Sequence, residues 1–438
     1  MNDIKNHLSE LNFFIEKYGT SINKEAIIKE DILRLGISFE DILSKENFSS
    51  KSYFIFSFNV DNDGDVINKK FPEEIALENG PYNLRRTVLS VRINKSSPYK
   101  VKFDSESGAH KLFLGENFIA GVSFSPEKSY MLKKTESGKS VRDVAPTIEW
   151  GYLIYLAVFR MCQYFDNNTE CLFCDMNSNY LIQKKANKNY SAVKSVADII
   201  ESLKIIESSE DSEAGAYTLT GGSIIDDIKF KGDTEVDFYV RFIEAIEENF
   251  QGKWISKVVV QAHTAKNLKR LKDAGAYIYH TNFEVWDKNL FEKICPGKSK
   301  FIGRDEWIKR IVDAVAVFGE YKVIPNFVAG IELCKPYGFS DVNAAVCSTA
   351  EGLEFFMSKG VIPRYTTWCP EKTSGLGKLG NSSAPLEYYV KLLLKWHELH
   401  YKYNLPIPEG YGAAGAGRAE FSVSAFMDAF KVATSQNL

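Results

Sequence analysis

The stretch MCQYFDNNTECLFCDMN, residues 161–177, decides how the rest of the chain is interpreted. It places three of the seven cysteines, Cys162, Cys171 and Cys174, within thirteen positions. The apolar run GYLIYLAVF (151–159) precedes it and is typical of a buried strand. The three thiols are therefore expected on the loop that follows this strand.

Three thiolates on one loop indicate a metal site. They can hold three irons of a [4Fe–4S] cluster and leave the fourth iron free for a small-molecule ligand. Zinc is the rival, but a structural zinc site usually takes four ligands in two close pairs, and the chain has no second CxxC or HxxxH pair. Ordinary buried free cysteines fit less well, because residues 166–170 between them are polar and turn-forming.

The segment resembles the cluster-binding loop of radical S-adenosylmethionine (SAM) enzymes. Their usual motif is CxxxCxxC with an aromatic residue before the last cysteine, and Cys171-Leu172-Phe173-Cys174 matches its second half. Eight residues separate Cys162 from Cys171, so the first gap is atypical. The resemblance implies a [4Fe–4S] cluster on Cys162, Cys171 and Cys174, and SAM with its adenine near Phe173.

Length and composition set the broad class of the protein. The 438 residues are enough for more than one domain, and 45% hydrophobic with 25% charged residues is ordinary for a soluble chain. A net charge of −3 gives no general attraction to nucleic acid or anionic membranes. The first residues, MNDIKNHLSELNFF, do not have the pattern of a signal peptide, and no apolar run is long enough to span a membrane. We expect a cytoplasmic protein, in a compartment that keeps thiols reduced.

Residues 1–145 are predicted to form an accessory domain. Apolar residues recur at helical spacing up to about residue 45. Short β-like runs then follow, broken by turn-forming residues, at 53–60, 87–93, 99–103 and 118–124. We predict a helical start and then mainly antiparallel strands.

Residues 146–370 are predicted to form the core, because apolar strands alternate with amphipathic helices in six units. The strands are expected at 151–159, 216–220, 257–263, 276–282, 322–328 and 361–367, and the helices at about 191–207, 234–250, up to Gly275, 305–318, 341–358 and 384–402. This alternation predicts a parallel sheet covered by helices, as either a barrel or an open doubly wound sheet. We favour an α/β partial (β/α)6 TIM-like barrel, because the cysteine loop lies at the carboxyl end of the first strand, where barrel active sites lie. Residues 371–438 are expected to be a C-terminal helical extension that closes the barrel.

The second strand runs into Gly221, Gly222 and Ser223. Glycines at this place let a ligand approach main-chain carbonyls closely. The segment resembles the GGE-like motif of radical SAM enzymes, which binds the methionyl amino group of SAM, with Ser223 in place of the acidic residue.

Further SAM-binding residues are implied by likeness to the biotin synthase group. Asn282 and Glu284 lie at alternate positions after the fourth strand, so they share one face and are expected to bond ribose hydroxyls or substrate. Arg310 matches an arginine that helps to hold SAM. Gly330 and Glu332 match a segment along the adenine, where the glycine admits the base and the glutamate anchors the loop.

Two observations bear on the chemistry. The third and fifth strands, VVVQAH and KVIPNF, lack the cysteines that hold the second cluster of biotin synthase, which predicts one cluster and no sulfur insertion. Cys369 follows the sixth strand, where its thiol is either a hydrogen donor to a substrate radical or a buried apolar group.

The resulting hypothesis is a radical SAM enzyme that cleaves SAM reductively to a 5′-deoxyadenosyl radical, which abstracts hydrogen from a small organic substrate in a biosynthetic rearrangement, cleavage or coupling. An electron donor such as flavodoxin or ferredoxin is the implied partner. The alternatives are a radical SAM enzyme that modifies peptides or proteins, and a non-enzymatic metal-binding protein. The chain has no cysteine-rich C-terminal extension of the kind common in peptide modifiers, which favours a small molecule.

Overall fold

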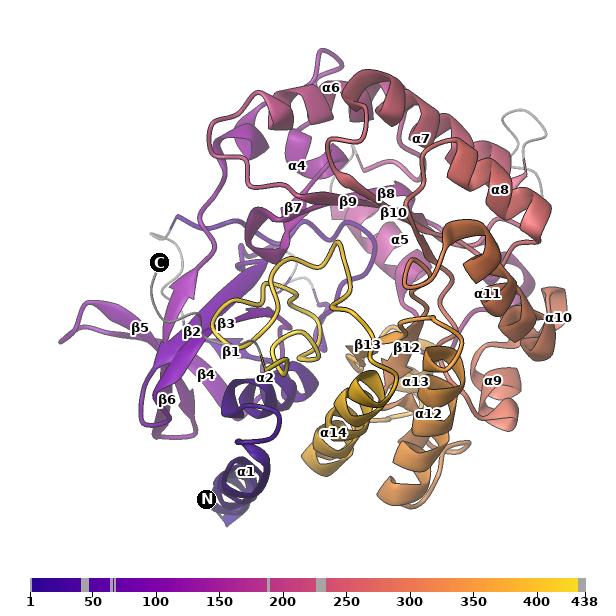
Figure 1. Cartoon of the computed structure of the whole chain (residues 1–438). Helices are drawn as coiled ribbons and strands as arrows, with labels where there is room; N and C mark the ends of the chain where they lie inside the picture. Colours follow the sequence, from indigo (N-terminus) through magenta and orange to yellow (C-terminus); the bar gives the residue numbers. More distant parts are fainter. Residues whose placement is uncertain are drawn as a thin grey trace.

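The computed structural model describes residues 2–40, 47–63, 66, 68–186, 190–225 and 234–431. Figure 1 shows a ring of helices and strands on one side and a separate antiparallel sheet on the other, with the C-terminal segment between them. No helix in the described part of the chain combines the length and the apolar character that a membrane crossing needs.

Six parallel strands form the inner wall of the ring. Four of them lie in one sheet in chain order: β8 (Leu153–Phe159), β9 (Ala216–Gly221), β10 (Ile255–Val259) and β11 (Ile278–His280). The short β7 (Thr147–Ile148) pairs antiparallel with β8.

The last two strands continue the same order. They are β12 (Asn326–Ala329) and β13 (Arg364–Thr367), which pair in parallel with each other. Parallel bridges join Tyr279 to Val323 and Glu284 to Phe327, and so connect the β11 side to the β12 side. The mixed α/β class is confirmed, and this strand order fits a partial TIM-like barrel.

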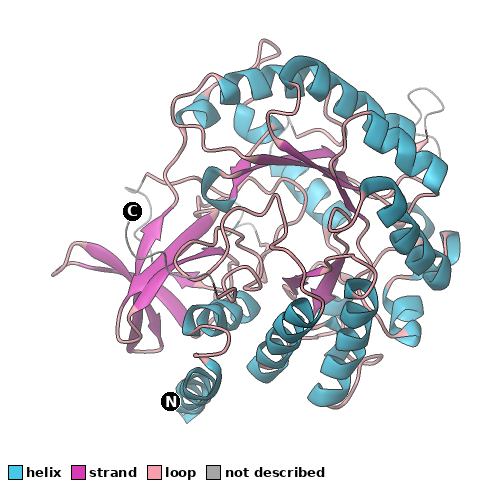
Figure 2. Cartoon of the chain, in the orientation of Figure 1, coloured by secondary structure: helices cyan, strands magenta, loops and turns pink. Residues whose placement is uncertain are grey.

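Helices cover the outside of the strands, as Figure 2 shows. The covering helices are α6 (Val196–Glu207), α7 (Glu235–Phe250), α8 (Ala265–Asp273), α11 (Arg304–Phe318), α12 (Val342–Met357) and α14 (Leu386–Lys402). Each buries one apolar face at helical spacing. On α7 this face includes Val236, Tyr239, Phe242, Ile243, Ile246 and Phe250.

All six predicted strand–helix units are present, and every strand except β9 is shorter than predicted. Three helices in the connections were missed: α5 (Met176–Ala186), α9 (Lys288–Ile294) and α10 (Pro296–Phe301). Short helical turns were also missed; they are η2 (Ser129–Leu132), α4 (Val141–Val144), η3 (Glu149–Gly151), η4 (Phe165–Asn167) and η5 (Ile331–Leu333). The helix predicted at about 191–207 is α6 and begins at Val196, where the Ser195 side chain caps it by accepting a hydrogen bond from the Asp198 amide.

The amino-terminal part begins with two helices, α1 (Asn2–Tyr18) and α2 (Lys24–Leu35). A six-stranded sheet follows in the order β1-β4-β5-β6-β2-β3, antiparallel except between β1 and β4. Its strands are β1 (Ser38–Phe39), β2 (Glu74–Asn79), β3 (Leu84–Ser90), β4 (Tyr99–Asp104), β5 (Ala109–Leu114) and β6 (Asn117–Phe124). The prediction found β3, β4 and β6 and missed the others.

The predicted strand at 53–60 is wrong. Tyr53 and Phe58 have positive φ angles of 47° and 46°, which break an extended backbone. Side chains from elsewhere bond the backbone carbonyls of this segment: Asn179 donates to Tyr53 and Ile55, and Arg160 donates to Phe54. The segment is therefore a loop held against the barrel.

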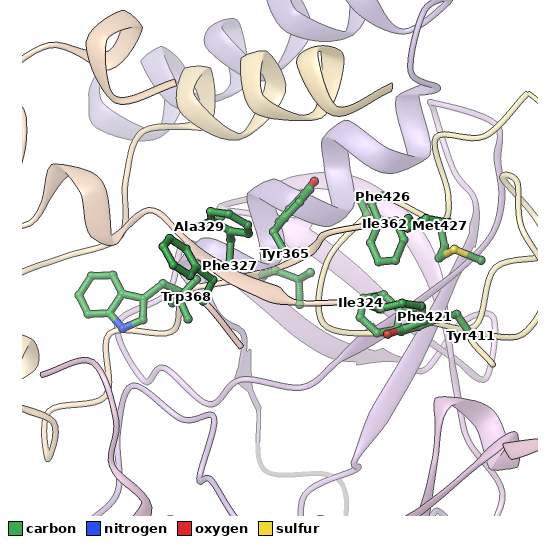
Figure 3. Close-up of a cluster of buried hydrophobic side chains, with 14 of the residues drawn as sticks. Ile324, Phe327, Ala329, Ile362, Tyr365, Trp368, Tyr411, Phe421, Phe426 and Met427 are labelled. Carbon is green, nitrogen blue, oxygen red and sulfur yellow. The ribbon is translucent and has the colours of Figure 1, made fainter. Parts of the chain in front are cut away.

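The prediction of a helical C-terminal extension is correct only up to Lys402. After α13 (Gly375–Lys378) and α14, residues 403–431 contain no helix or strand. Four glycines with positive φ angles of 73–96° prevent a helix there: Gly410, Gly412, Gly415 and Gly417. Figure 3 shows side chains of this segment, Phe421, Phe426 and Met427, packed beside Ile324 and Ile362.

The predicted domain boundaries stay a prediction. A single hydrophobic core contains residues from all three predicted segments, for example Ile27, Leu219 and Phe426. A buried carboxylate also joins them. Glu30 on α2 accepts hydrogen bonds from the Thr367 hydroxyl on β13 (2.5 Å) and the Ala425 amide (2.7 Å).

We predict that Glu30→Ala lowers the free energy of unfolding by about 3 kcal/mol, because the donors of Thr367, Tyr365 and Ala425 lose their buried acceptor. Chemical denaturation followed by circular dichroism measures this. Glu16→Ala, on an exposed part of α1, is the control and is expected to change stability by less than about 0.5 kcal/mol. Equal effects of the two substitutions would contradict the assigned role of Glu30.

Candidate functional site

A cavity of about 240 Å³ lies inside the barrel. All six parallel strands contribute to its wall, with Tyr155, Thr218, Lys257, His280, Asn326 and Arg364 as examples from β8 to β13. The loop at 53–60 and the segment after Lys402 add Phe54, Phe56, Phe58, Tyr411 and Phe421. The cavity is therefore the lumen of the ring of parallel strands, and segments that lie outside the parallel sheet add to its wall.

The three cysteines of the opening motif line this cavity. The thiols lie close together, because a negative charge on Cys171 would raise the pKa of both Cys162 and Cys174. The loop that carries them is well anchored: Asn177 accepts from the Cys162 amide (2.9 Å) and donates to the Cys162 carbonyl (3.3 Å). The Cys174 amide donates to the Cys171 carbonyl at 3.0 Å, which forms a tight turn. The structure thus brings together the three predicted ligands.

Burial controls the state of these thiols. It raises the pKa of Cys162 to about 12 and that of Cys174 well above its usual value. Thiolates here therefore need a positive partner, which an iron–sulfur cluster provides. Among the described residues, no three His, Cys, Asp or Glu side chains lie close enough to hold one metal ion. The donor set, three thiols around one enclosed space, fits a cluster.

Gly222 lies directly against the cysteine loop. A Cβ atom on it would lie 1.9 Å from the Met161 carbonyl oxygen and 2.5 Å from the Cα of Cys162. The amide of Gln163 also donates to the Ser223 carbonyl at 3.0 Å. The predicted Gly221-Gly222-Ser223 segment therefore lies beside the first cysteine, and all three residues line the cavity.

Glu235 was missed by the sequence analysis although it fixes this end of the cavity. Its carboxylate accepts hydrogen bonds from the amides of Ile224 (3.1 Å) and Gln261 (3.0 Å), and it bonds the His263 ring (2.7 Å). It thereby ties the loop after β9 to the end of β10. Glu235 is the first residue of α7, and nothing local in the sequence reveals these distant partners.

Asn282 and Glu284 both line the cavity. The Oδ1 atom of Asn282 is buried and has no hydrogen-bond partner, so it is free to accept from a bound molecule. Glu284 instead pairs with Lys298 at 2.7 Å, and Lys298 also donates to the Asn282 carbonyl at 2.6 Å. The backbone of Glu284 has a φ of 75°, a strained conformation of the kind often found at functional sites.

Three other predicted SAM-binding residues are not among the cavity-lining residues. Arg310 donates to the Ala262 carbonyl (2.9 Å) and pairs with Glu306 (2.7 Å). Glu332 is fully buried and accepts from the Gly330 amide at 2.8 Å, so it fixes the turn after β12. A Cβ on Gly330 would meet the hydroxyl of Tyr389 at 2.4 Å. Their proposed contacts with SAM stay predictions.

Phe173 and Cys369 line the same cavity. Cys369 is buried, and burial raises the pKa of its thiol well above the usual value, with the charge of Glu371 acting in the same direction. A neutral thiol facing the lumen has a transferable hydrogen atom, so the arrangement agrees with either of the two roles considered for it.

The end of the cavity away from the cysteine loop holds charged groups for which the sequence predicted no role. Lys257 lies within β10, and burial lowers the pKa of its ammonium to about 8. Burial raises the pKa of Glu149 to about 8. Lys257 could have been identified from the sequence, because it is a lysine at the start of the apolar run KVVV. Glu149 precedes β8 in a turn that carried no such signal.

Comparisons with known proteins give distant matches. No family model matches the chain. Bacteriochlorophyllide c C-7(1)-hydroxylase of Chlorobaculum limnaeum is 24% identical over 166 residues, which are 36% of this chain and 38% of that protein. The matched region thus spans well under half of this relative's length.

Among solved structures, methylornithine synthase is 14% identical with a TM-score of 0.39, over 66% of this chain and 84% of that one. Coproporphyrinogen III oxidase from Escherichia coli, a radical SAM enzyme, is 12% identical with a TM-score of 0.34, over 57% of this chain and 52% of that one. The chain is thus distantly similar to proteins that include a radical SAM enzyme.

We predict that Gly222→Ala prevents cluster assembly while the fold is retained, because the added Cβ displaces the cysteine loop. Iron and sulfide content per chain after anaerobic reconstitution should fall several-fold, with an unchanged far-ultraviolet circular dichroism spectrum. Gly121→Ala is the matched control, since its Cβ would meet only the Glu78 carbonyl at an ordinary 3.4 Å. Full iron content in Gly222→Ala would show that the contact is not required.

Proposed function

We propose that this chain is a radical SAM enzyme that acts on a small organic substrate. The observation that carries the proposal is the position of Cys162, Cys171 and Cys174, whose thiols line the same enclosed lumen as Gly221, Gly222 and Asn282. Cluster ligands and groups suited to SAM thus face one small space.

Each residue has a definite task in this proposal. Cys162, Cys171 and Cys174 would hold three irons, and a bound cluster with SAM would supply a 5′-deoxyadenosyl radical. The free Oδ1 of Asn282 would accept a hydrogen bond from a SAM hydroxyl. Phe173, beside Cys174, offers a ring face to the adenine. These contacts would hold SAM within the lumen.

An internal cavity suits radical chemistry. A carbon radical abstracts hydrogen from most nearby carbons, so the protein must exclude other reactants. The loop at 53–60 and the segment at 403–431 contribute side chains to the cavity wall and so shield it. An electron donor such as flavodoxin or ferredoxin, and a cytoplasmic location, belong to the same proposal.

The cavity favours a small molecule over a peptide. In a peptide modifier the β-rich amino-terminal part would present the target, but here its side chains Lys51, Glu73 and Glu74 form part of the cavity wall. The enclosed volume is about 240 Å³. An enzyme that modifies peptides or proteins stays the second candidate, and only for targets that insert a single side chain into the cavity.

The reconstituted wild-type chain is expected to form 5′-deoxyadenosine from SAM with dithionite under anaerobic conditions. Single replacement of Cys162, Cys171 or Cys174 by Ala should lower the yield at least about 100-fold, because a cluster lacking one thiolate ligand is not stably held. Liquid chromatography with mass spectrometry measures the product.

Cys347→Ala is the matched control for these variants. Cys347 is an exposed cysteine on α12, so its loss should leave both cluster content and 5′-deoxyadenosine unchanged. A wild-type chain with a reducible cluster that forms no 5′-deoxyadenosine, with or without candidate substrates, would contradict the proposal, as would zinc in place of iron.

A fourth cysteine tests the non-enzymatic alternative. The Cys295 thiol is buried next to the Cys171 thiol, which makes it a possible fourth ligand of a coordinatively complete cluster. We predict that Cys295→Ser keeps its iron content and its 5′-deoxyadenosine yield, because the three-cysteine motif is sufficient. Loss of the cluster in Cys295→Ser would favour a four-thiolate cluster with no open iron.

A further inference from the structure

The end of the cavity away from the cysteine loop holds nitrogen groups that form no ion pair with the described residues. They surround the ring of Tyr411: the Lys257 ammonium lies 4.5 Å from its centroid, and the Arg364 guanidinium lies 5.8 Å from it. Among the described residues, neither cation forms an ion pair; Lys257 donates to the Gly410 carbonyl, and the Nε of Arg364 is buried without a partner. His280 bonds the Tyr411 hydroxyl at 2.9 Å through Nε2, and its Nδ1 is also buried without a partner.

Glu149 and Glu74 are carboxyl groups beside these nitrogens. Glu149 interacts electrostatically with both Lys257 and Arg364, and its Oε2 atom has no hydrogen-bond partner. Glu74 accepts the amides of Glu149 (2.7 Å) and Trp150 (2.8 Å). Neither carboxyl group forms a hydrogen bond with the Nε of Arg364 or the Nδ1 of His280, so these buried nitrogens are left for an acceptor on a bound molecule.

This end is separate from the cysteine end of the same cavity. Lys257 pairs in register with Thr218 on β9, and Thr218 lies three residues before Gly221. Three strand residues correspond to about 10 Å along the strand. A molecule anchored at Lys257 thus extends toward the cysteine loop.

We propose that the substrate carries a single carboxylate, which binds between Lys257 and Arg364, and an apolar body that extends toward the cysteine loop. The inference rests on the proposed function, because it treats the lumen as the substrate site. Arg364 provides a planar fork for the carboxylate, Lys257 neutralises its charge, and Nδ1 of His280 is a third donor when Tyr411 donates to Nε2.

The lining supports this substrate class. The cavity wall includes aromatic side chains, among them Phe54, Phe58, Trp368 and Phe421, which suit an apolar body. The carboxylate would hold the substrate in register while a carbon–hydrogen bond faces the radical.

Isothermal titration calorimetry with 3-phenylpropanoate and its neutral isostere 3-phenylpropanamide tests the inference on the full chain, both as purified and after anaerobic reconstitution. The wild type should bind the carboxylate at least about ten-fold more tightly than the amide, as expected for charge-assisted hydrogen bonds. Lys257→Met and Arg364→Gln should each reduce this preference to within about two-fold.

Lys194→Met is the matched control. Lys194 is a buried lysine that also bonds a backbone carbonyl, that of Val144, but it does not line the main cavity. It should keep the wild-type preference. Equal affinity for carboxylate and amide, no binding of the carboxylate at millimolar concentration, or an unchanged preference in both cavity variants would overturn the inference.

The binding experiment does not depend on SAM cleavage. A chain that binds the carboxylate selectively but forms no 5′-deoxyadenosine would contradict the proposed function and leave the anion site in place. A chain that forms 5′-deoxyadenosine without carboxylate selectivity would contradict only the substrate class.

Discussion

The contact between Gly222 and the cysteine loop is the constraint on which the site depends. The backbone of Gly222 approaches Cys162 so closely that a Cβ would overlap the Met161 carbonyl and the Cys162 Cα. This contact sets the position of the first cysteine relative to β9, and Asn177 holds the same cysteine from the other side through both its backbone groups. The loop of eight residues between Cys162 and Cys171 thus starts at a fixed backbone position. Its extra length therefore does not imply that Cys162 is loosely held.

Closure of the lumen depends on segments that are distant in sequence. The loop at 53–60 is held by Asn179 and Arg160, and the segment after Lys402 is held by α2. On α2, Glu30 bonds the Ala425 amide, and Lys29 bonds Asp428 (2.7 Å) and the Phe421 carbonyl (2.6 Å). Because these anchors are buried and paired, the wall of the cavity is part of the core and not a separate lid.

The sequence predicted those features that leave a local pattern. Buried parallel strands are continuously apolar and their covering helices are amphipathic, so six units were recognisable from periodicity alone. The run YFIFSFNV has the residue types of a strand, but its carbonyls are bonded by Asn179 and Arg160, more than one hundred positions away in the chain. Glu235 illustrates the same limit, because its partners belong to other elements.

Ion pairing distinguishes the buried charged groups of the lumen from those that stabilise the fold. A buried ion costs stability unless it is paired, and the structural pair Lys29–Asp428 meets this requirement. Lys257 and Arg364 form no ion pair with the described residues, and Glu149 and Trp150 add backbone strain with φ angles of 55° and 57°. The strain is maintained by Glu74, which accepts both amides. Buried nitrogens without hydrogen-bond partners and backbone strain at one end of one cavity are difficult to explain by stability, and a bound anion would supply the missing acceptors.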